Sequence, residues 1–325
     1  MSTAEDRPRD NESDKEADAE PAEESLDAAI ARVAVAQHAA FSRQQALDLG
    51  FTPKQVDGRV AAGRWNRLLP RVFEIAGATR TGLQAAMAAT LWAGDGSLVS
   101  HAAAARLWGF PDVRAQRVEV WTPRNARSEL VAVHRGIRLD RADRTMLGPI
   151  PITTPVRTLI DMSGRLEDLK LASVLEDLIK RDLIDPGRLR ARLDALRASG
   201  RPGAGRLDAL LDRRGDGPPM ESALETLVWS LIFESGVTLP ERQHWVEVPG
   251  GRYRLDFCWP HLMLGLECDS FEHHGARRDD WGKDRARYAE LAVIGIRVMP
   301  VTWNVARHDP KRVLRWLRDG VRDAA

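Results

Sequence analysis

The sequence predicts an α/β multidomain protein, and three features indicate this class. The chain has 325 residues, which exceeds one ordinary domain and indicates two or three. Near the N-terminus, two short helical segments precede a basic hairpin, the order of a winged helix-turn-helix. Toward the C-terminus, residues 252–274 (RYRLDFCWPHLMLGLECDSFEHH) alternate like a β-hairpin and are flanked by helical patterns. A mixed α/β middle domain is expected between these regions.

The first 26 residues predict a disordered acidic tail. They combine many acids with a few basic residues, Pro and Ser, a composition that cannot bury enough apolar surface to fold. The formal net charge of the whole chain is +1 because acidic and basic segments cancel, so overall charge does not indicate a nucleic-acid partner. No apolar run is long enough to span a bilayer, and a signal-peptide core is absent. These features predict a soluble, cytoplasmic protein with no membrane partner.

Residues 27–78 predict the winged helix-turn-helix. Ser42 is followed by Gln45 three positions later, which predicts an N-terminal capping box. Thr52 is expected to cap a second helix, whose first turn begins with Pro53. This helix buries its valines and presents its polar side chains outward, and the segment RWNRLLPRVFEI that follows predicts a two-stranded wing.

This arrangement resembles the N-terminal domain of the AbiEi family of antitoxins, which act as transcriptional regulators in toxin–antitoxin loci. The resemblance covers residues 27–78 and implies DNA as the partner. It also implies contacts to bases or phosphates from the second helix and from the wing, at Lys54, Gln55, Arg59, Arg64 and Arg67. A protein-interaction role for the same fold is the alternative.

The middle region, residues 79–197, predicts two helices over 83–110, a small sheet and then further helices from Pro155. No nucleophile triad, phosphate loop or metal-ligand spacing occurs there, and His101 and His134 are expected to be structural. A connecting or partner-binding domain is therefore predicted. Residues 198–219 are rich in Gly, Pro and Arg and predict a linker before the last domain, residues 220–325.

The hairpin places acids inside strand-like apolar runs. If Trp259 pairs with Leu262 across the turn, Asp256 lies opposite Gly265 and diagonal to Glu267. Carboxylates about 4 Å apart repel by roughly 4 kcal/mol at an effective dielectric near 20, so such a pair needs a cation or a shared proton. The alternative is a one-sided hairpin whose acids face solvent.

Asp269 lies two residues beyond Glu267 and is expected on the same face because strand side chains alternate. Oxygen-only ligands suit Mg²⁺ or Mn²⁺, which keep several waters and take up substrate phosphates. The residues therefore predict a metal site at Asp256 and Glu267, with Asp269 beside it.

Residues 218–322 carry a longer set of motifs in a fixed order. They are Glu225 in a helix, Gln243, Asp256-Phe257-Cys258-Trp259-Pro260, Glu267-Cys268-Asp269, His273, Asp284 with Arg287, Gly295-Ile296-Arg297-Val298 and Thr302-Trp303. This order resembles the very-short-patch-repair-like (Vsr-like) endonucleases of the PD-(D/E)xK nuclease fold. The resemblance implies a restriction-endonuclease-like mixed sheet flanked by helices, with the metal at Asp256 and Glu267 and with Glu225 contributing from the first helix.

The sequence departs from the wider nuclease pattern at Asp269, where Lys is usual. A Lys would orient or deprotonate the attacking water, whereas an Asp can only hold metal or accept a proton. His273 is a candidate to replace that function, since its unperturbed pKa is near neutrality, although a surface histidine is an equal alternative. Glu221 and Glu225 lie one helical turn apart, so either can reach the site.

Two functions follow. The main prediction is a Mg²⁺-dependent DNA endonuclease that uses Asp256, Glu267, Asp269, Glu225 and His273 for phosphodiester hydrolysis. The alternative is a non-catalytic, DNA-binding transcriptional regulator of the antitoxin type with a degenerate nuclease-like domain. The sequence is compatible with a homo-oligomer and determines neither the oligomeric state nor the DNA site.

Overall fold

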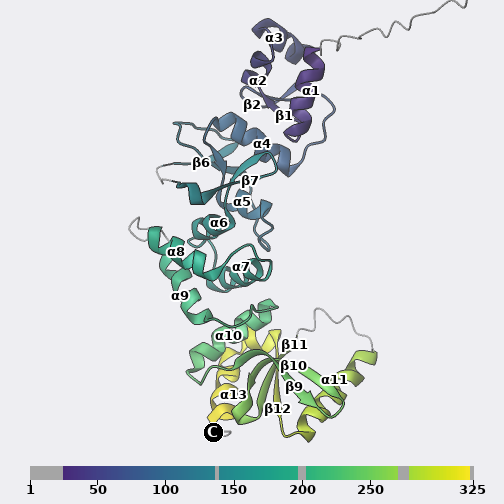
Figure 1. Cartoon of the computed structure of the whole chain (residues 1–325), viewed down its shortest axis with the longest axis vertical. Helices are drawn as coiled ribbons and strands as arrows, with labels where there is room; N and C mark the ends of the chain where they lie inside the picture. The colour runs from purple at the N-terminus through teal and green to yellow at the C-terminus, as the bar shows by residue number, and fades with distance from the viewer. Residues whose placement is uncertain (1–24, 136–138, 197–202, 270–277, 323–325) are drawn as a thin grey trace, which may run out of the picture. The chain divides into compact units, whose positions relative to one another are not determined.

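A computed structural model describes residues 25–135, 139–196, 203–269 and 278–322, with side chains of 278–284 excepted. The chain forms two compact units, residues 1–79 and 80–325. The described residues form three sheets, two of them mixed, so the chain is an α/β protein with several domains (Figure 1). Residues 1–24 of the predicted acidic tail lie outside the described residues.

The first unit combines three helices with a small antiparallel sheet. The helices are α1 (Leu26–Ala36), α2 (Arg43–Asp48) and α3 (Pro53–Ala61). The strands β1 (Ala40–Ser42), β2 (Trp65–Leu69) and β3 (Val72–Ile75) pair in the order β1-β3-β2. The hairpin expected after α3 is therefore extended by a third strand, which pairs Phe41 with Phe73.

Local capping explains where α2 and α3 begin. Ser42 accepts a hydrogen bond from the Gln45 N–H while the Gln45 side chain accepts from the Ser42 N–H, so the predicted capping box is confirmed. Thr52 and Gln55 form a second box, with Pro53 at the first helical position. Each box satisfies backbone donors that would otherwise lack partners, and so sets the turn between the two helices.

The middle of the second unit contains a five-stranded mixed sheet in the order β6-β5-β4-β8-β7. The strands are β4 (Leu98–Val99), β5 (Val118–Trp121), β6 (Val131–His134), β7 (Arg144–Leu147) and β8 (Ile150–Thr153). The surrounding helices are α4 (Gly82–Ala93), α5 (His101–Leu107), α6 (Pro155–Met162), α7 (Asp168–Lys180) and α8 (Pro186–Leu196). Helices α5 to α8 share one apolar core.

The prediction of a linker over residues 198–219 is wrong for half of the segment. Residues Ala204–Arg214 form helix α9, and Leu207 and Leu211 are buried in the core shared with α7 and α8. The apolar spacing of this short stretch places two leucines on one helix face, and burying each is worth about 2 kcal/mol. That gain outweighs the weak helix propensity of a Gly- and Arg-rich sequence.

The C-terminal part contains a four-stranded mixed sheet in the order β12-β11-β10-β9. The strands are β9 (Glu241–Val248), β10 (Gly251–Trp259), β11 (Leu264–Asp269) and β12 (Arg297–Thr302). The helices are α10 (Ala223–Ser235), α11 (Arg278–Val293), α12 (Trp303–His308) and α13 (Pro310–Arg322). Helices α10, α12 and α13 pack on one side of the sheet, and Leu291 of α11 packs with a second cluster (Figure 1).

The register of the β10–β11 hairpin differs from the predicted one. Trp259 pairs with Leu264, not with Leu262, and Phe257 pairs with Leu266. Residues Pro260–Leu262 form a 3₁₀ turn and Met263 adopts a positive φ of 50°, so the connection is two residues longer than expected. The shift removes the predicted Asp256–Gly265 pairing and moves Asp256 to the position level with Glu267.

None of the helices in the described part of the chain has the length and apolar character that a membrane-spanning helix needs.

Candidate functional site

The residues predicted to contact DNA lie on α3 and on the β2–β3 hairpin of the first unit. Lys54, Arg64 and Arg67 are exposed, and their side chains have no hydrogen bond or ion pair within the described part of the chain. An exposed cation without an internal partner is free to bind a phosphate oxygen. These three side chains are the accessible part of the predicted interface.

The other two predicted contacts are engaged inside the unit. The Gln55 side chain accepts the Thr52 N–H at 2.8 Å, as part of the capping box. Arg59 donates to both Asp27 carboxylate oxygens, at 2.8 and 3.0 Å, and its guanidinium lies 4.6 Å from the centre of the Phe51 ring. Both side chains therefore stabilise the unit, and their use in DNA binding would require breaking these contacts.

The C-terminal part brings two of the predicted metal ligands together at the end of the β10–β11 ladder. Glu267 is buried and Asp256 is half-buried. The Asp256 Oδ2 accepts the backbone N–H of Cys268 at 2.8 Å, so this side chain satisfies a donor just beyond the last hairpin pair. Glu267 forms an ion pair with Arg287 of α11.

Glu225 joins this group from the first turn of α10. Its Oε2 accepts hydrogen bonds from the Glu221 N–H and the Gln243 side chain, both at 2.8 Å. Glu225 is buried, whereas Glu221 is partly exposed and pairs with Arg254 at 2.7 Å. Of the two acids one turn apart, Glu225 is therefore the one that lies with the buried carboxyl groups.

Burial raises the pKa of all three carboxyl groups. Burial and the nearby Asp256 raise the pKa of Glu267 to about 8, and Arg287 offsets only part of this effect. Burial also raises the pKa of Asp256 and of Glu225, while backbone N–H groups partly oppose the shift. Burial and nearby like charges disfavour the ionised form of an acid, so near neutral pH Glu267 is mostly protonated when no metal ion is bound.

The donor set fits a divalent cation in part. One oxygen of Asp256 and one oxygen of Glu267 lack a hydrogen bond within the described residues. Oxygen ligands suit Mg²⁺ or Mn²⁺. However, the three carboxyl groups do not bring an oxygen each within 4.8 Å of one another, and the guanidinium of Arg287 already binds Glu267. Movement of Arg287 would be needed before a metal could bind all three.

Two predicted catalytic residues are not part of this group. Asp269 is exposed at the end of β11, opposite Thr302 of β12. His273 lies outside the described residues. The missing Lys is therefore not replaced by a cation from β11, and the nearest basic side chain to the buried acids is Arg287.

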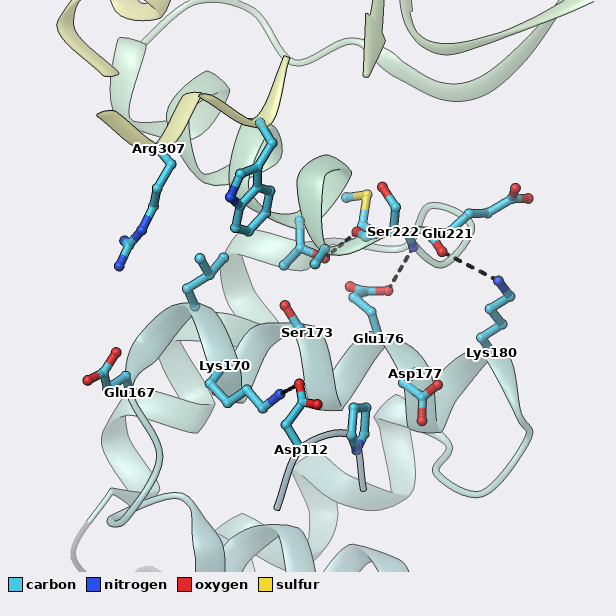
Figure 2. Close-up of a pocket in the computed structure, with 16 residues that line it drawn as sticks. Asp112, Glu167, Lys170, Ser173, Glu176, Asp177, Lys180, Glu221, Ser222 and Arg307 are labelled. Carbon is cyan, nitrogen blue, oxygen red and sulfur yellow. Dashed lines mark hydrogen bonds and ion pairs between the residues drawn. The ribbon is translucent and has the colours of Figure 1, made fainter. Parts of the chain in front are cut away.

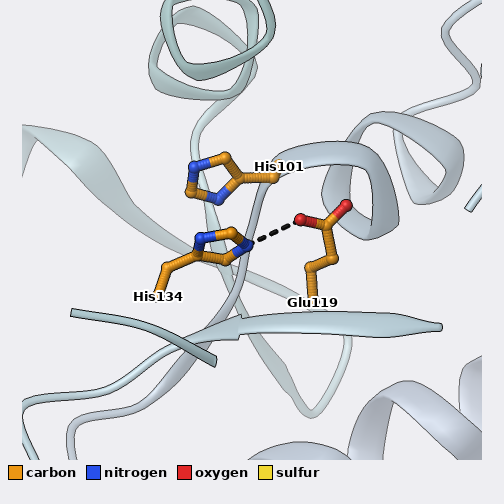
Figure 3. A group of neighbouring side chains, drawn as sticks. All are labelled: His101, Glu119 and His134. Atoms are coloured by element: carbon orange, nitrogen blue, oxygen red, sulfur yellow. Dashed lines mark hydrogen bonds and ion pairs between the residues drawn. The ribbon is translucent and has the colours of Figure 1, made fainter. Parts of the chain in front are cut away.

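A second polar cluster occurs in the middle sheet, where the sequence predicted only structural histidines. His101 begins α5, Glu119 lies on β5 and His134 ends β6. The imidazole rings stack with centroids 3.7 Å apart, and His134 Nε2 lies 2.6 Å from a Glu119 oxygen (Figure 3). Arg165 donates to both Glu119 oxygens, at 3.1 and 2.8 Å.

This cluster is the one set of three His, Cys or acidic residues in the described chain whose ligand atoms all lie within 4.8 Å. It is also charge-compensated without a metal. Burial would raise the pKa of Glu119, but the hydrogen bonds from His134 and Arg165 outweigh burial and lower the pKa to about 2. Burial, with the neighbouring His134, lowers the pKa of His101 to about 3. The parallel pairing of β5 with β6, which brings Glu119 beside His134, leaves no signal in sequence spacing.

The second unit also contains a cavity of about 410 Å³ beside α7 (Figure 2). Several of its charged side chains are already paired: Lys170 with Asp112, Lys180 with the Glu221 carbonyl, and Glu176 with the Met220 N–H. These contacts use part of the hydrogen-bonding capacity of the cavity lining.

Comparison with known proteins gives a family match over the region of the second cluster. Residues 96–213 match the model of the AbiEi antitoxin C-terminal domain. The AbiEi match supports the predicted family, but it falls on the middle region, whereas the sequence resemblance was drawn over residues 27–78. His101, Glu119 and His134 all lie inside the AbiEi match.

Two curated relatives and one solved structure are also similar. Over 94 residues the chain is 33% identical to the uncharacterized proteins MT2308 and Rv2248 of Mycobacterium tuberculosis strains CDC 1551 and H37Rv. The match covers 29% of this chain and 34% of each relative, so it spans about a third of their length. The crystal structure of the RV2827C protein from Mycobacterium tuberculosis is 19% identical, with a TM-score of 0.39, and the match covers 68% of this chain and 87% of that one.

Proposed function

We propose that this protein is a DNA-binding transcriptional regulator of the antitoxin type, whose C-terminal nuclease-like domain does not catalyse DNA cleavage. The observation that carries the proposal is the match of residues 96–213 to the AbiEi antitoxin C-terminal domain. AbiEi antitoxins bind DNA, and this property comes to the present chain as part of the proposal.

The geometry of the first unit supports DNA as the partner. Helices α2 and α3 are joined by a capped turn, and the β2–β3 hairpin follows, as in a winged helix-turn-helix. Lys54 is exposed in the first turn of α3, Arg64 is exposed just before β2, and Arg67 is exposed on β2. If α3 lies in the major groove of DNA and the basic hairpin residues contact the DNA phosphates, all three side chains face DNA.

The contacts of the acid group support a domain that does not cleave DNA. Arg287 forms an ion pair with Glu267, and the Lys of the nuclease pattern is replaced by an exposed Asp269. A guanidinium on a metal-ligand oxygen competes with a divalent cation for the same lone pairs. Asp269 could accept a proton from a water, but its exposed side chain is not part of the acid group.

Binding to the DNA upstream of the protein's own gene tests this proposal. Fluorescence anisotropy should show tighter binding to that fragment than to a shuffled fragment of equal length. A Lys54→Ala, Arg64→Ala, Arg67→Ala variant should bind more weakly, with a log–log salt slope smaller by up to about 3, since each lost phosphate contact removes roughly 0.9. The matched control changes Arg297, Lys311 and Arg315 to Ala, three exposed cations of the C-terminal part. Equal affinities for the two triple variants would contradict the proposed interface.

A metal-dependent endonuclease is the second candidate, and a specific observation favours it. Buried Glu225 and Glu267 lie with half-buried Asp256 near the end of β10 and β11, and Asp256 and Glu267 each have an oxygen that lacks a hydrogen bond within the described residues. If Arg287 moves away, Asp256, Glu267 and Glu225 would hold Mg²⁺ or Mn²⁺, which would polarise the phosphate and activate a water. Turnover would then need a proton acceptor outside this group, for which His273 remains the predicted residue.

Cleavage of supercoiled, linear and mismatched DNA separates the two candidates. The regulator proposal expects no Mg²⁺- or Mn²⁺-dependent cleavage above that of Glu267→Ala. The matched control is Glu221→Ala, which removes a partly exposed acid that pairs with Arg254. Cleavage that is lost in Glu267→Ala and kept in Glu221→Ala would establish the endonuclease and overturn the proposal of an inactive domain.

A further inference from the structure

A second cavity of about 410 Å³ lies where helix α9 leads into the C-terminal part. Its wall is formed by the turn 215–218, by Trp229 of α10 and by residues 239–242 at the start of β9. Two arginines, Arg214 and Arg242, line it. Both side chains are more than nine-tenths buried, with 6% and 8% of their surfaces exposed.

Arg242 lies near the acids Glu176 and Asp216 but forms an ion pair with neither. Within the described residues its guanidinium forms no hydrogen bond and no ion pair, and its Nη1 is buried without an acceptor. The guanidinium carbon lies over the face of Trp229, 4.9 Å from the ring centroid. Stacking on an aromatic ring satisfies the flat face of a guanidinium but none of its five N–H donors. Burying such a group without acceptors is costly, so the cavity requires an acceptor.

The neighbouring groups do not supply the missing negative charge. Glu176 is the one buried carboxylate here, and it pairs with Arg214 at 3.0 Å and accepts the Met220 N–H at 3.0 Å. Glu241 is exposed and pairs with His244 at 2.7 Å. Asp216 is exposed and lies beyond ion-pair distance. Two buried guanidinium groups thus share a single buried carboxylate.

We propose that this cavity is a binding site for a phosphate group, carried by inorganic phosphate or by a small phosphate monoester. A phosphate is largely dianionic near neutral pH and offers oxygens to two guanidinium groups at once. Arg242 would donate its planar fork to two phosphate oxygens while Trp229 holds the guanidinium in place. Arg214 would contribute as the second lining guanidinium, since its Nε has ion-pair contact with Glu176 but no aligned hydrogen bond.

Gly217 fits the same interpretation. A Cβ built at this position would lie 2.0 Å from Arg242 Nη2, so only Gly lets the backbone approach the guanidinium this closely. Its φ lies outside the positive range, so replacement by Ala imposes no backbone strain of its own. Gly217→Ala therefore displaces the Arg242 fork without removing any charge.

Isothermal titration of the full-length protein with inorganic phosphate, and separately with AMP, tests the site at constant ionic strength. Wild type should bind at least one of them saturably, and Arg242→Met should weaken binding about tenfold or more, since a charge-assisted bidentate contact is lost. The matched control is Arg213→Met, an exposed neighbour on α9 that does not line the cavity and should bind as wild type. Tighter binding of AMP than of phosphate would identify a monoester site, and the reverse an inorganic phosphate site.

Two further variants keep the test decisive if Arg242→Met fails to fold. Arg242→Lys keeps the charge but loses the fork, and Gly217→Ala keeps both residues but moves the fork, so each should weaken binding relative to Arg213→Met. Absence of saturable binding by wild type at millimolar phosphate and AMP would overturn the proposal. Equal affinity in Arg213→Met and all three cavity variants would overturn it as well.

Discussion

Glu119 of the middle sheet and Glu267 of the C-terminal sheet are buried to the same extent, with 9% and 8% of their surfaces exposed. Their pKa values nevertheless move in opposite directions. Burial tends to raise both, but in Glu119 the hydrogen bonds from His134 and Arg165 prevail and lower the pKa to about 2. In Glu267, Asp256 and Glu225 add to burial and raise the pKa to about 8 despite Arg287.

At similar exposure, the neighbouring charges decide whether the tendency of burial to raise the pKa is overcome, as in Glu119, or reinforced, as in Glu267. The middle cluster is complete, because each charge has a partner of opposite sign. The C-terminal group is incomplete, because of its three carboxyl groups one, that of Glu267, has an ion pair within the described residues. Strongly perturbed acids that lack a partner are the commoner mark of a binding site, while a compensated cluster is the commoner mark of a structural element.

The largest expected effect is the difference in stability between the variants that replace each acid by its neutral amide. Glu119→Gln should lower the free energy of unfolding by about 2–3 kcal/mol at pH 7, because Arg165 and His134 lose an ionised partner; Arg165 is partly exposed, which limits the loss. Glu267→Gln should lie within about 0.5 kcal/mol of wild type or be more stable, since the acid is already largely neutral. Urea unfolding followed by circular dichroism measures both. Equal losses would show that the two sites do not differ as described.

The pH dependence of stability should carry opposite signs for the two acids. The pKa of Glu267 is raised from an ordinary 4.5 to about 8, so its contribution is fully present below about pH 4.5 and is lost as the pH rises to about 8. The pKa of Glu119 is lowered to about 2, so its contribution is present above about pH 4.5 and is lost as the pH falls to about 2.

Unfolding curves between pH 5 and pH 9 isolate the Glu267 effect. Over this window Glu267→Gln should flatten the fall in stability seen for wild type. The control is Glu221→Gln, whose wild-type acid is partly exposed, and it should follow the wild-type curve. A Glu267→Gln profile parallel to wild type would contradict the raised pKa.

A smaller effect is expected from the histidine of the compensated cluster. His134→Ala removes the hydrogen bond to Glu119 and the stacking on His101, and should cost about 1 kcal/mol while Arg165 keeps Glu119 paired. Arg135→Ala, an exposed change one residue away, is the matched control. If both variants unfold at the same urea concentration, the His134 contact contributes nothing to stability.

The smallest effect should come from Asp256→Asn. The amide oxygen can still accept the Cys268 N–H, and the loss of one like charge relieves Glu267, so the change should stay within about 0.5 kcal/mol of wild type. Asp256→Ala leaves that N–H without its acceptor and should cost about 1–2 kcal/mol. Thermal unfolding at pH 7 distinguishes the two. A large loss in Asp256→Asn would mean that its charge, and not its hydrogen bond, is required.

Local sequence determined the features that depend on neighbours along the chain. The capping residues Ser42 and Thr52 start α2 and α3 as predicted, because an N-cap bond spans only three residues. The alternation before Trp259 likewise produced β10, and the apolar spacing after Pro310 produced α13. The hairpin register was missed by two residues, because a 3₁₀ turn and a positive φ at Met263 lengthened the connection.

Tertiary structure alone decided which side chains meet. Glu119 and His134 are 15 residues apart and touch because β5 and β6 run parallel, and Arg165 and Glu119 are 46 residues apart. Arg287 of α11 contacts Glu267 of β11. Arg242, at the start of β9, packs against Trp229 of α10. Spacing along the sequence reports helix and strand periods, whereas these contacts depend on how separate elements pack. The sequence by itself therefore specified the capped helices, the hairpin strands and the acids, and packing decided which charges were compensated and which were left without a partner.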